Sequence, residues 1–393
     1  MIFLGLLFRK EDEMKIAAKS KNSLLQNQAN TFQWNCIDGL YENGVGNLHI
    51  INALPVGTYP RKYSDLIIPS FTWEYQGGQH FQLGSINLPI FKQYGRYRAC
   101  KKLLRKFKEE EIIIYSTYFP FLKVVKKLDE RYKVTLIVPD LPKYYDYAKV
   151  GCFKKLLRTI NNRAIEKCMA RIDRFVLLTE AMKEPLGVGN RPYTVVEGIC
   201  AKNCPAEICK TRDGKKTILY AGSLNKQFGI DVLVDAFQQI EGEDYELLLC
   251  GGGDYQDTLQ EICAKDSRIK FLGFLPKAKV LELQAHATVL VNPRQNVGEY
   301  TKYSFPSKTM EYLLSGIPVI AYKLDGIPDE YDRYFYYVED NTSQSLAKAI
   351  IDVCEDTSGV YERTALKAIE FIRTQKNPKK QAGKILELIN EKE

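Results

Sequence analysis

The chain of 393 residues is too long for one ordinary hydrophobic core, so its length predicts two domains of similar size. It is 45% hydrophobic and 26% charged, as soluble globular proteins are, and no apolar run approaches the ~20 residues of a membrane span. The net charge of +8 is moderate and comes with no nucleic-acid-binding motif, so we expect no nucleic-acid partner.

The first predicted elements are a strand, a loop and a helix. Residues 1–8 (MIFLGLLF) have no basic segment before them and no small-residue cleavage site after them, which predicts a buried strand and not a signal peptide. Residues 9–23 are charged and lack a period, so we expect a loop at the strand's end, followed by a helix over residues 24–40. Residues 55–84 are rich in Pro, Gly and Tyr, and we expect them to be irregular.

Two basic helices are predicted in the first half, over residues 96–108 and 154–174. Apolar side chains recur between the basic ones with helical spacing. Such helices can lie on an anionic membrane surface, although an ordinary solvated helix face gives the same pattern. Because there are two of them in one half, we expect an anionic membrane surface as a partner.

Asp140 is a candidate functional residue in this half. Residues 134–138 (VTLIV) predict a buried strand, and Asp140 follows directly in a Pro-Asp-Leu-Pro turn. The carboxyl end of a strand is the edge where ligands bind in open α/β sheets. A helix cap or turn residue is the alternative interpretation.

The polar, aperiodic residues 201–216 predict a linker between a first domain of residues 1–200 and a second of residues 217–375. Residues 376–393 contain an amphipathic helix that can pack back on the first domain. Strands alternate with helices in both halves. This alternation predicts an α/β fold of two Rossmann-like, doubly wound parallel sheets whose strand ends face each other across a cleft.

Metal and redox sites have little support. The ten cysteines are scattered without a CxxC spacing, and the three histidines form no HExxH, so we expect reduced thiols, no metal and no cofactor. The glycine run at residues 251–253 does not continue as GxGxxG, and no P-loop occurs, which disfavours dehydrogenases and P-loop nucleotidases.

The strongest functional pattern lies in residues 299–322. The turn-forming run YSFPSK leads into a predicted helix, TMEYLL, whose start presents free N–H groups suited to phosphate. Lys308 adds a positive charge there, and the Glu311 carboxylate one turn later can accept two hydrogen bonds from a ribose diol. Together they predict a nucleotide-diphosphate site, although any α/β protein contains loop–helix–strand units in which such a glutamate is merely solvated.

The order of motifs over residues 217–330 resembles the second half of GT-B, family 4 glycosyltransferases. A strand runs into Ala-Gly, a second into GGGD, and FLGFL, FPSKTMEYLLSGIPVIA and DGIP follow. Residues 195–199 (VVEGI) resemble the family's end-of-domain strand, with Glu197 in place of the usual asparagine. The FPSKTMEY form is similar to enzymes of capsule, O-antigen and exopolysaccharide assembly.

The resemblance implies roles for particular residues. Glu311 matches the second glutamate of the family's E-x₇-E motif, which binds the donor's ribose. The first glutamate, which contacts the donor sugar, is replaced by Tyr303. Gly222 matches the glycine beside the pyrophosphate, but Ser223 and Phe228 stand where the family has an arginine and a lysine.

Because both family cations are missing, we expect Lys308, with Lys226 or Arg294, to stabilise the charge of the leaving diphosphate. Asp140 falls at the family's His-Asp position, with Pro139 in place of the histidine, and can orient the acceptor. Lys308, Asp140 and Tyr303 are therefore the expected catalytic residues. The other expected donor-binding residues are Ser223, Gly252, Phe274, Leu275, Ser307 and Thr309.

The resemblance implies a cytoplasmic hexosyltransferase, peripheral at the inner membrane face. It would transfer sugar from a UDP-sugar to a lipid-linked glycan in polysaccharide biosynthesis, with retained configuration and without metal. Two alternatives stay open: a nucleotide-sugar epimerase of the same fold, and an inactive nucleotide- or glycan-binding subunit.

Overall fold

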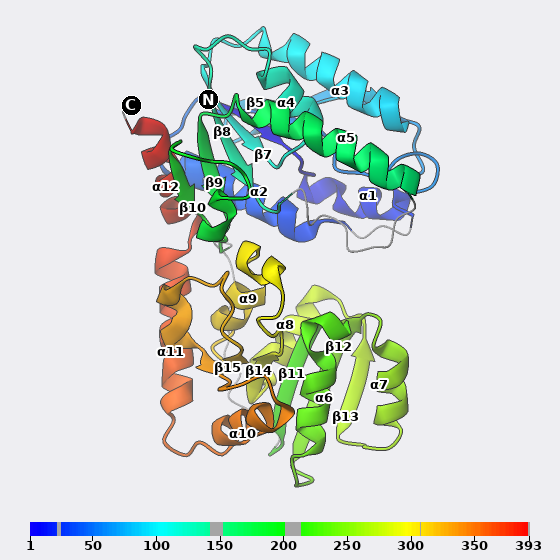
Figure 1. Ribbon diagram of the computed structural model, residues 1–393, viewed down its shortest axis with the longest axis vertical. Coiled ribbons are helices and arrows are strands. Elements are labelled where there is room, and N and C mark those ends of the chain that lie inside the picture. The colour runs from blue at the N-terminus through cyan, green and yellow to red at the C-terminus, as the bar shows by residue number, and fades with distance from the viewer. Residues whose placement is uncertain (22–24, 142–151, 201–213, 307, 392–393) are drawn as a thin grey trace. The chain divides into compact units, whose positions relative to one another are not determined.

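The computed structural model describes residues 1–21, 25–141, 152–200, 214–306 and 308–391 (Figure 1). The chain divides into two compact units: a first unit of Met1–Ala201 with Asn377–Glu393, and a second unit of Lys202–Lys376. Most of the predicted linker, residues 201–213, lies outside the described ranges. Each unit is built on a Rossmann-like sheet, as the alternating pattern predicted.

The first unit contains an eight-stranded sheet in the order β10-β9-β8-β7-β1-β2-β5-β4. All neighbours pair in parallel except β4 and β5, which form a hairpin. The strands are β1 (Ile2–Gly5), β2 (His49–Asn52), β4 (Phe71–Tyr75), β5 (Gly78–Gln82), β7 (Glu111–Tyr115), β8 (Lys133–Val138), β9 (Arg174–Leu177) and β10 (Tyr193–Val195). A separate antiparallel pair joins β3 (Ile67–Ile68) to β6 (Ser85–Ile86).

Helices cover the sheet of the first unit, and their buried stripes explain why they form. The helices are α1 (Glu13–Lys19), α2 (Asn27–Glu42), α3 (Pro89–Leu104), α4 (Phe119–Val125), α5 (Cys152–Met169) and α12 (Pro378–Asn390). Apolar side chains of α2 and α12 meet those of the central strands in one core, which includes Ile37, Ile50, Ile113 and Ile385. Helix α3 packs against α4, and α4 packs against α5.

Two sequence-based expectations for this unit were wrong. Residues 55–84 are not irregular, because they contain β3, β4 and β5. The β4–β5 turn places Gln76 and Gly77 at φ values of 49° and 73°, and only Gly77 favours that region, so the turn signal is weak. The predicted loop at residues 9–23 contains a short turn (Lys10–Asp12) and α1, whose single buried residue, Ile16, gives no visible period.

The second unit contains a six-stranded, wholly parallel sheet in the order β13-β12-β11-β14-β15-β16. In chain order this is 3-2-1-4-5-6, the doubly wound arrangement whose ligand crevice lies where the order reverses, between the first and fourth strands. The strands are β11 (Lys216–Ser223), β12 (Tyr245–Gly252), β13 (Ile269–Gly273), β14 (Val289–Asn292), β15 (Val319–Ala321) and β16 (Tyr336–Tyr337).

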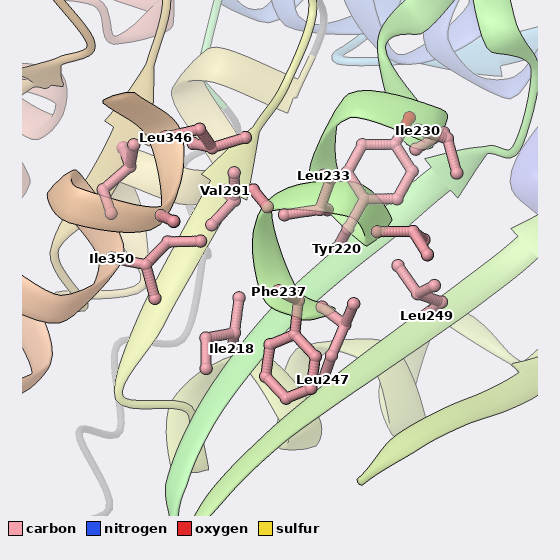
Figure 2. Close-up of a cluster of buried hydrophobic side chains, with 14 of the residues drawn as sticks. Ile218, Tyr220, Ile230, Leu233, Phe237, Leu247, Leu249, Val291, Leu346 and Ile350 are labelled. Atoms are coloured by element: carbon pink, nitrogen blue, oxygen red, sulfur yellow. The ribbon is translucent and has the colours of Figure 1, made fainter. Parts of the chain in front are cut away.

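One face of this sheet is covered by α6 and α10. Figure 2 shows Leu233 and Phe237 of α6 and Ile350 of α10 packed on side chains of β11, β12 and β14. The helices of the unit are α6 (Ile230–Gln238), α7 (Gln256–Cys263), α8 (Lys277–His286), α9 (Lys308–Leu314), α10 (Ser343–Cys354) and α11 (Val360–Gln375). None of the helices in the described ranges of either unit combines the length and apolar composition that crossing a bilayer requires.

Candidate nucleotide-binding site

Glycines bring β11 and β12 close together at the carboxyl edge of the second unit's sheet. Gly222 pairs with Gly251, and Ser223 pairs with Gly252. Gly251 has φ +129°, and a Cβ there would lie 1.8 Å from the carbonyl oxygen of Gly222, so no larger residue fits. Gly222, Gly251 and Gly252 therefore contribute no side chains of their own to this edge, which adjoins the topological switch point.

Lys308, the first residue of α9, reaches this glycine edge. A Cβ at Gly222 would lie 2.6 Å from Lys308 Nζ and 2.5 Å from the hydroxyl oxygen of Tyr220. The ammonium lies over the Tyr220 ring, 5.4 Å from its centroid. Burial lowers the pKa of Lys308 to about 8, although Glu311 opposes the shift. The lysine is thus still mostly protonated at pH 7 but sits in surroundings where its charge is poorly hydrated.

Glu311 follows one turn later and is held from α8. Its Oε1 accepts a hydrogen bond of 2.9 Å from Gln284 Nε2, and its Oε2 lies 3.6 Å from Lys277 Nζ. Gln284 is buried, whereas the Glu311 side chain keeps 28% of its surface exposed. A carboxylate has about four acceptor positions, so a fixed and partly exposed Glu311 can still accept hydrogen bonds from a ligand.

Tyr312 holds α9 against β11, and Tyr220 stabilises the end of β11. The buried Tyr312 hydroxyl accepts a 3.1 Å hydrogen bond from the N–H of Ala221, the residue before Gly222. Tyr220 donates to the carbonyl oxygen of Ser223 at 3.0 Å. Burial raises the pKa of both hydroxyls, so both stay neutral and keep these bonds at physiological pH. Tyr312 therefore sets the position of α9, and with it Lys308, relative to Gly222.

Arg294 is the second cation near this edge. Its guanidinium stacks on the Tyr300 ring at 4.9 Å and donates from Nη2 to Ser304 Oγ at 3.0 Å. Its charge also acts on the Tyr220 hydroxyl, where it opposes the effect of burial. Tyr303 lies beside Ser304, at the end of the short turn Glu299–Tyr303, and is partly exposed.

The other predicted donor-binding residues are distributed around the same strand ends. Phe274 follows β13 and is 75% exposed, and its ring covers Gly252, where a Cβ would lie 2.8 Å from Phe274 Cε2. Leu275 is partly exposed next to it. Lys226 instead lies over the Tyr255 ring, 5.5 Å from the centroid, so its ammonium is turned toward α7. Ser307 lies outside the described residues.

Buried polar atoms at this edge lack partners. Gln284 Oε1, Arg294 Nε and Thr309 Oγ1 make no hydrogen bond to any residue in the described ranges. A buried polar atom without a partner costs free energy, so such atoms mark places that water or a ligand completes. Among the described residues, no group of three or more His, Cys, Asp or Glu side chains is arranged to hold a metal ion.

Asp140 belongs to the first unit. It is exposed and follows β8, so it lies at the carboxyl edge of that sheet, where the strand pattern placed it. The segment after it, residues 142–151, lies outside the described ranges.

Sequence reasoning missed Gln284, Tyr220 and Tyr312. The signal for Gln284 was present, because a polar residue stands on the apolar face of α8, one helical turn after Val280. The role of Tyr312 could not be inferred, because its partner lies 91 residues away in the chain.

Comparison with known proteins finds sequence similarity in the second unit and structural similarity over the whole chain. A family model described as "Glycosyl transferases group 1" matches residues 215–356. The uncharacterized glycosyltransferase MJ1607 of Methanocaldococcus jannaschii is 31% identical over 120 residues, which are 30% of this chain and 29% of that protein. The amylovoran biosynthesis glycosyltransferase AmsK of Erwinia amylovora is 23% identical over 150 residues, 36% of this chain and 37% of that protein. The matched segments thus span about a third of these relatives' lengths.

The fold is similar over nearly the entire chain to the structure of Alr3699/HepE from Anabaena in complex with UDP. The TM-score is 0.63 at 14% identity, and the match covers 99% of this chain and 98% of the other. Residues 215–356 are therefore similar to the glycosyl transferases group 1 family, and the chain as a whole has the GT-B fold.

Proposed function

We propose that the chain is a retaining glycosyltransferase that binds a UDP-sugar at the carboxyl edge of the second unit's sheet. The observation that carries the proposal is the juxtaposition of Lys308 Nζ with the bare backbone of Gly222. Glu311 lies one turn further along the same helix and is held by Gln284. Near the switch point, the lysine and the glycine backbone suit the diphosphate of a nucleoside diphosphate, and the carboxylate suits its ribose.

The diphosphate is the group that Lys308 and the Gly222 backbone would bind. The Lys308 ammonium is largely desolvated by burial, and its attraction for an anion is stronger in such surroundings than in water. Arg294, whose charge also acts on Tyr220, is a second cation available at this edge. The two would neutralise charge that family enzymes neutralise with residues replaced here by Ser223 and Phe228, and no metal is required for that task.

The nucleoside would lie along α9 and the end of β13. Glu311 can accept hydrogen bonds from both ribose hydroxyls, and the exposed Phe274 beside Gly252 offers an apolar surface to a base. Uracil is the base that we propose, because the similar fold of HepE was determined in complex with UDP.

In the reaction, the bond between the anomeric carbon and the diphosphate oxygen breaks, and its electron pair leaves on UDP. A new bond forms from the same face to an acceptor hydroxyl oxygen, whose proton passes to the departing phosphate. Lys308 would stabilise the negative charge that develops on the leaving group. Tyr303, which replaces the family's sugar-contacting glutamate, would face the hexose, and Asp140 would orient the acceptor hydroxyl.

For the acceptor, we propose a lipid-linked glycan of cell-surface polysaccharide biosynthesis. AmsK, which acts in amylovoran biosynthesis according to its name, supports the polysaccharide class.

A thermal-shift screen against UDP, GDP and ADP, in buffer with EDTA, tests the proposal. A ligand present at 100 times its Kd should stabilise the protein by roughly 2.7 kcal/mol, which raises the melting temperature measurably. We expect UDP to act, and Glu311→Ala to abolish the shift, while the control Glu299→Ala in the preceding exposed loop should retain it. A response to none of the three diphosphates would contradict the proposal.

A further inference from the structure

The first unit exposes large apolar side chains that its own core does not use. Ile67 of β3 is 67% exposed and pairs directly with Ile86 of β6, which is 50% exposed. Three residues at the start of α3 continue the surface: Ile90, Phe91 and Tyr94 are 80%, 59% and 55% exposed. We call these five residues the apolar patch. Exposed apolar residues are common singly, but neighbouring ones in this number indicate a binding surface.

The apolar patch lies on a firmly anchored part of the unit. Helix α3 packs on β6, where a Cβ at Gly95 would lie 3.6 Å from Ser85 Cβ. On the buried side of α3, Lys92 donates to the carbonyl oxygen of Val56, and Arg96 donates to that of Leu54 at 2.6 Å. The exposed side chains are therefore presented by a fixed helix and strand pair, and not by a loop that could fold them inward.

Basic residues continue the same exposed face of α3. Phe91, Tyr94, Arg98, Lys102 and Arg105 are all exposed and follow one another at spacings of three or four residues, so they form one stripe along the helix. The stripe is aromatic in its first half and cationic in its second. The Arg98 guanidinium lies 5.7 Å from the centroid of the Tyr94 ring, which joins the two halves.

No acidic residue interrupts this helix. Residues 89–108 contain eight Lys or Arg residues and neither Asp nor Glu. A helix that faces only water gains from mixed charges, whereas one that faces an anionic surface gains from cations alone. The charge of α3 therefore points to an anionic partner, and the adjoining patch points to an apolar one.

We propose that the apolar patch and the cationic half of α3 together dock the first unit on an anionic phospholipid bilayer. Ile67, Ile86, Ile90 and Phe91 would enter the boundary between headgroups and acyl chains, and Tyr94 would lie at headgroup level. Arg98, Lys102 and Arg105 would contact lipid phosphates. The docking surface is independent of the nucleotide site, so failure of one proposal leaves the other intact.

Co-sedimentation with lipid vesicles tests the docking surface. The full chain should bind vesicles of phosphatidylcholine with 30% phosphatidylglycerol much more strongly than pure phosphatidylcholine, and binding should weaken as salt is added. Each cation near the surface contributes roughly fivefold in partition, so Arg98→Gln/Lys102→Gln/Arg105→Gln should weaken binding on the order of 100-fold. The control Lys367→Gln/Lys379→Gln/Lys380→Gln removes the same charge from exposed positions elsewhere and should bind almost as the wild type does.

Insertion of the apolar patch into the bilayer can be measured separately from the contribution of the cations. Ile90→Ser/Phe91→Ser should lose most vesicle binding, whereas Val360→Ser/Leu366→Ser, at exposed positions of α11, should not. Phe91→Trp should show a blue-shifted emission with anionic vesicles and quenching by brominated acyl chains. Melting temperatures near that of the wild type verify that the variants are folded.

Three results would overturn the inference. The first is absence of binding to anionic vesicles at low salt. The second is full binding by both the Ile90→Ser/Phe91→Ser variant and the Arg98→Gln/Lys102→Gln/Arg105→Gln variant. The third is conversion of a dimer to a monomer by Ile90→Ser/Phe91→Ser without any effect on vesicle binding. The last result would identify the patch as a contact between two copies of the chain.

Discussion

Both units contain Rossmann-like sheets, but different side chains surround the carboxyl ends of their strands. Near the switch point of the second unit, Gly222 close to the end of β11 pairs with Gly251 of β12, and the ammonium of Lys308 lies beside Gly222. In the first unit, β1 lies between β2 and β7, and the chain after it is covered by the protein's own amides. Gln33 bonds both the N–H and the carbonyl oxygen of Leu6, and Asn52 does the same for Leu7.

This difference shows how two sheets of the same architecture can differ in their suitability for binding a phosphate at the carboxyl edge. The backbone N–H and carbonyl groups after β1 are paired with side-chain amides in the first unit, whereas the edge of the second unit has the ammonium of Lys308 beside Gly222. A nucleoside diphosphate should therefore bind to the second unit. The predictions below test that contrast.

The largest effect is expected from Lys308→Ala. Removing one preorganised group that stabilises transition-state charge typically lowers kcat by about 10²–10³-fold, and no cation of the family stands at Ser223 or Phe228 to compensate. UDP release from a UDP-sugar, followed with a coupled assay, measures the loss. Lys265→Ala, which removes an exposed lysine next to α7, is the matched control and should be almost fully active. Full activity of Lys308→Ala would show that the leaving-group charge is stabilised elsewhere.

An effect of similar size is expected from Glu311→Ala on nucleotide affinity. Two hydrogen bonds from ribose hydroxyls to a charged acceptor are lost, each worth about 1.5–3 kcal/mol, so UDP should bind on the order of 100-fold more weakly or worse. Calorimetric titration measures the change, with Glu299→Ala as the control. Equal affinities of the two variants would place the ribose away from α9.

The pH dependence of UDP binding should follow Lys308. Its pKa of about 8 means that the attractive ammonium is lost as the pH rises, so UDP affinity should fall roughly tenfold between pH 7 and pH 9. Stability without ligand should change in the opposite direction. The unfolded chain retains the lysine proton up to about pH 10.4, so deprotonation of the folded state contributes stability as the pH rises above about 8. Both slopes should diminish in Lys308→Ala, and identical slopes in the variant would exclude Lys308 as the titrating group.

The smallest effect on nucleotide binding is expected from Asn52→Ala. It leaves the buried N–H and carbonyl of Leu7 without partners and should lower the free energy of unfolding by about 1–3 kcal/mol. UDP affinity should not change. Urea denaturation and calorimetry separate the two effects, and a loss of UDP affinity at full stability would place the nucleotide in the first unit.

Features that depend on local sequence were predictable. The loop, lysine and carboxylate of residues 299–322 lie within one short segment, so their spacing alone indicated that Lys308 and Glu311 share a helix. The alternation of strands and helices likewise indicated both sheets. The structure places Lys308 beside Gly222, which are 86 residues apart in sequence, and the spacing of strand ends in a parallel sheet made that juxtaposition foreseeable.

Features that depend on contacts between distant residues were not predictable. Gln33 bonds Leu6 across 27 residues, yet it looks in sequence like an ordinary helical glutamine. Gln284 stands out on the apolar face of α8, but the sequence does not reveal that its partner is Glu311, also 27 residues away. The β4–β5 hairpin was missed because Gln76 is an unusual residue at a positive φ. Lys226 was expected near the phosphates, but its position over the Tyr255 ring depends on how the turn after β11 packs against α7.

Hydrogen–deuterium exchange with and without UDP is the measurement that tests the central contrast most directly. We predict that UDP protects peptides covering residues 220–226, 250–256 and 308–314 of the second unit. Peptides covering residues 3–9 and 50–58 at the first unit's edge should exchange at unchanged rates. Protection at the first unit's edge, with none around Gly222 and Lys308, would contradict the account.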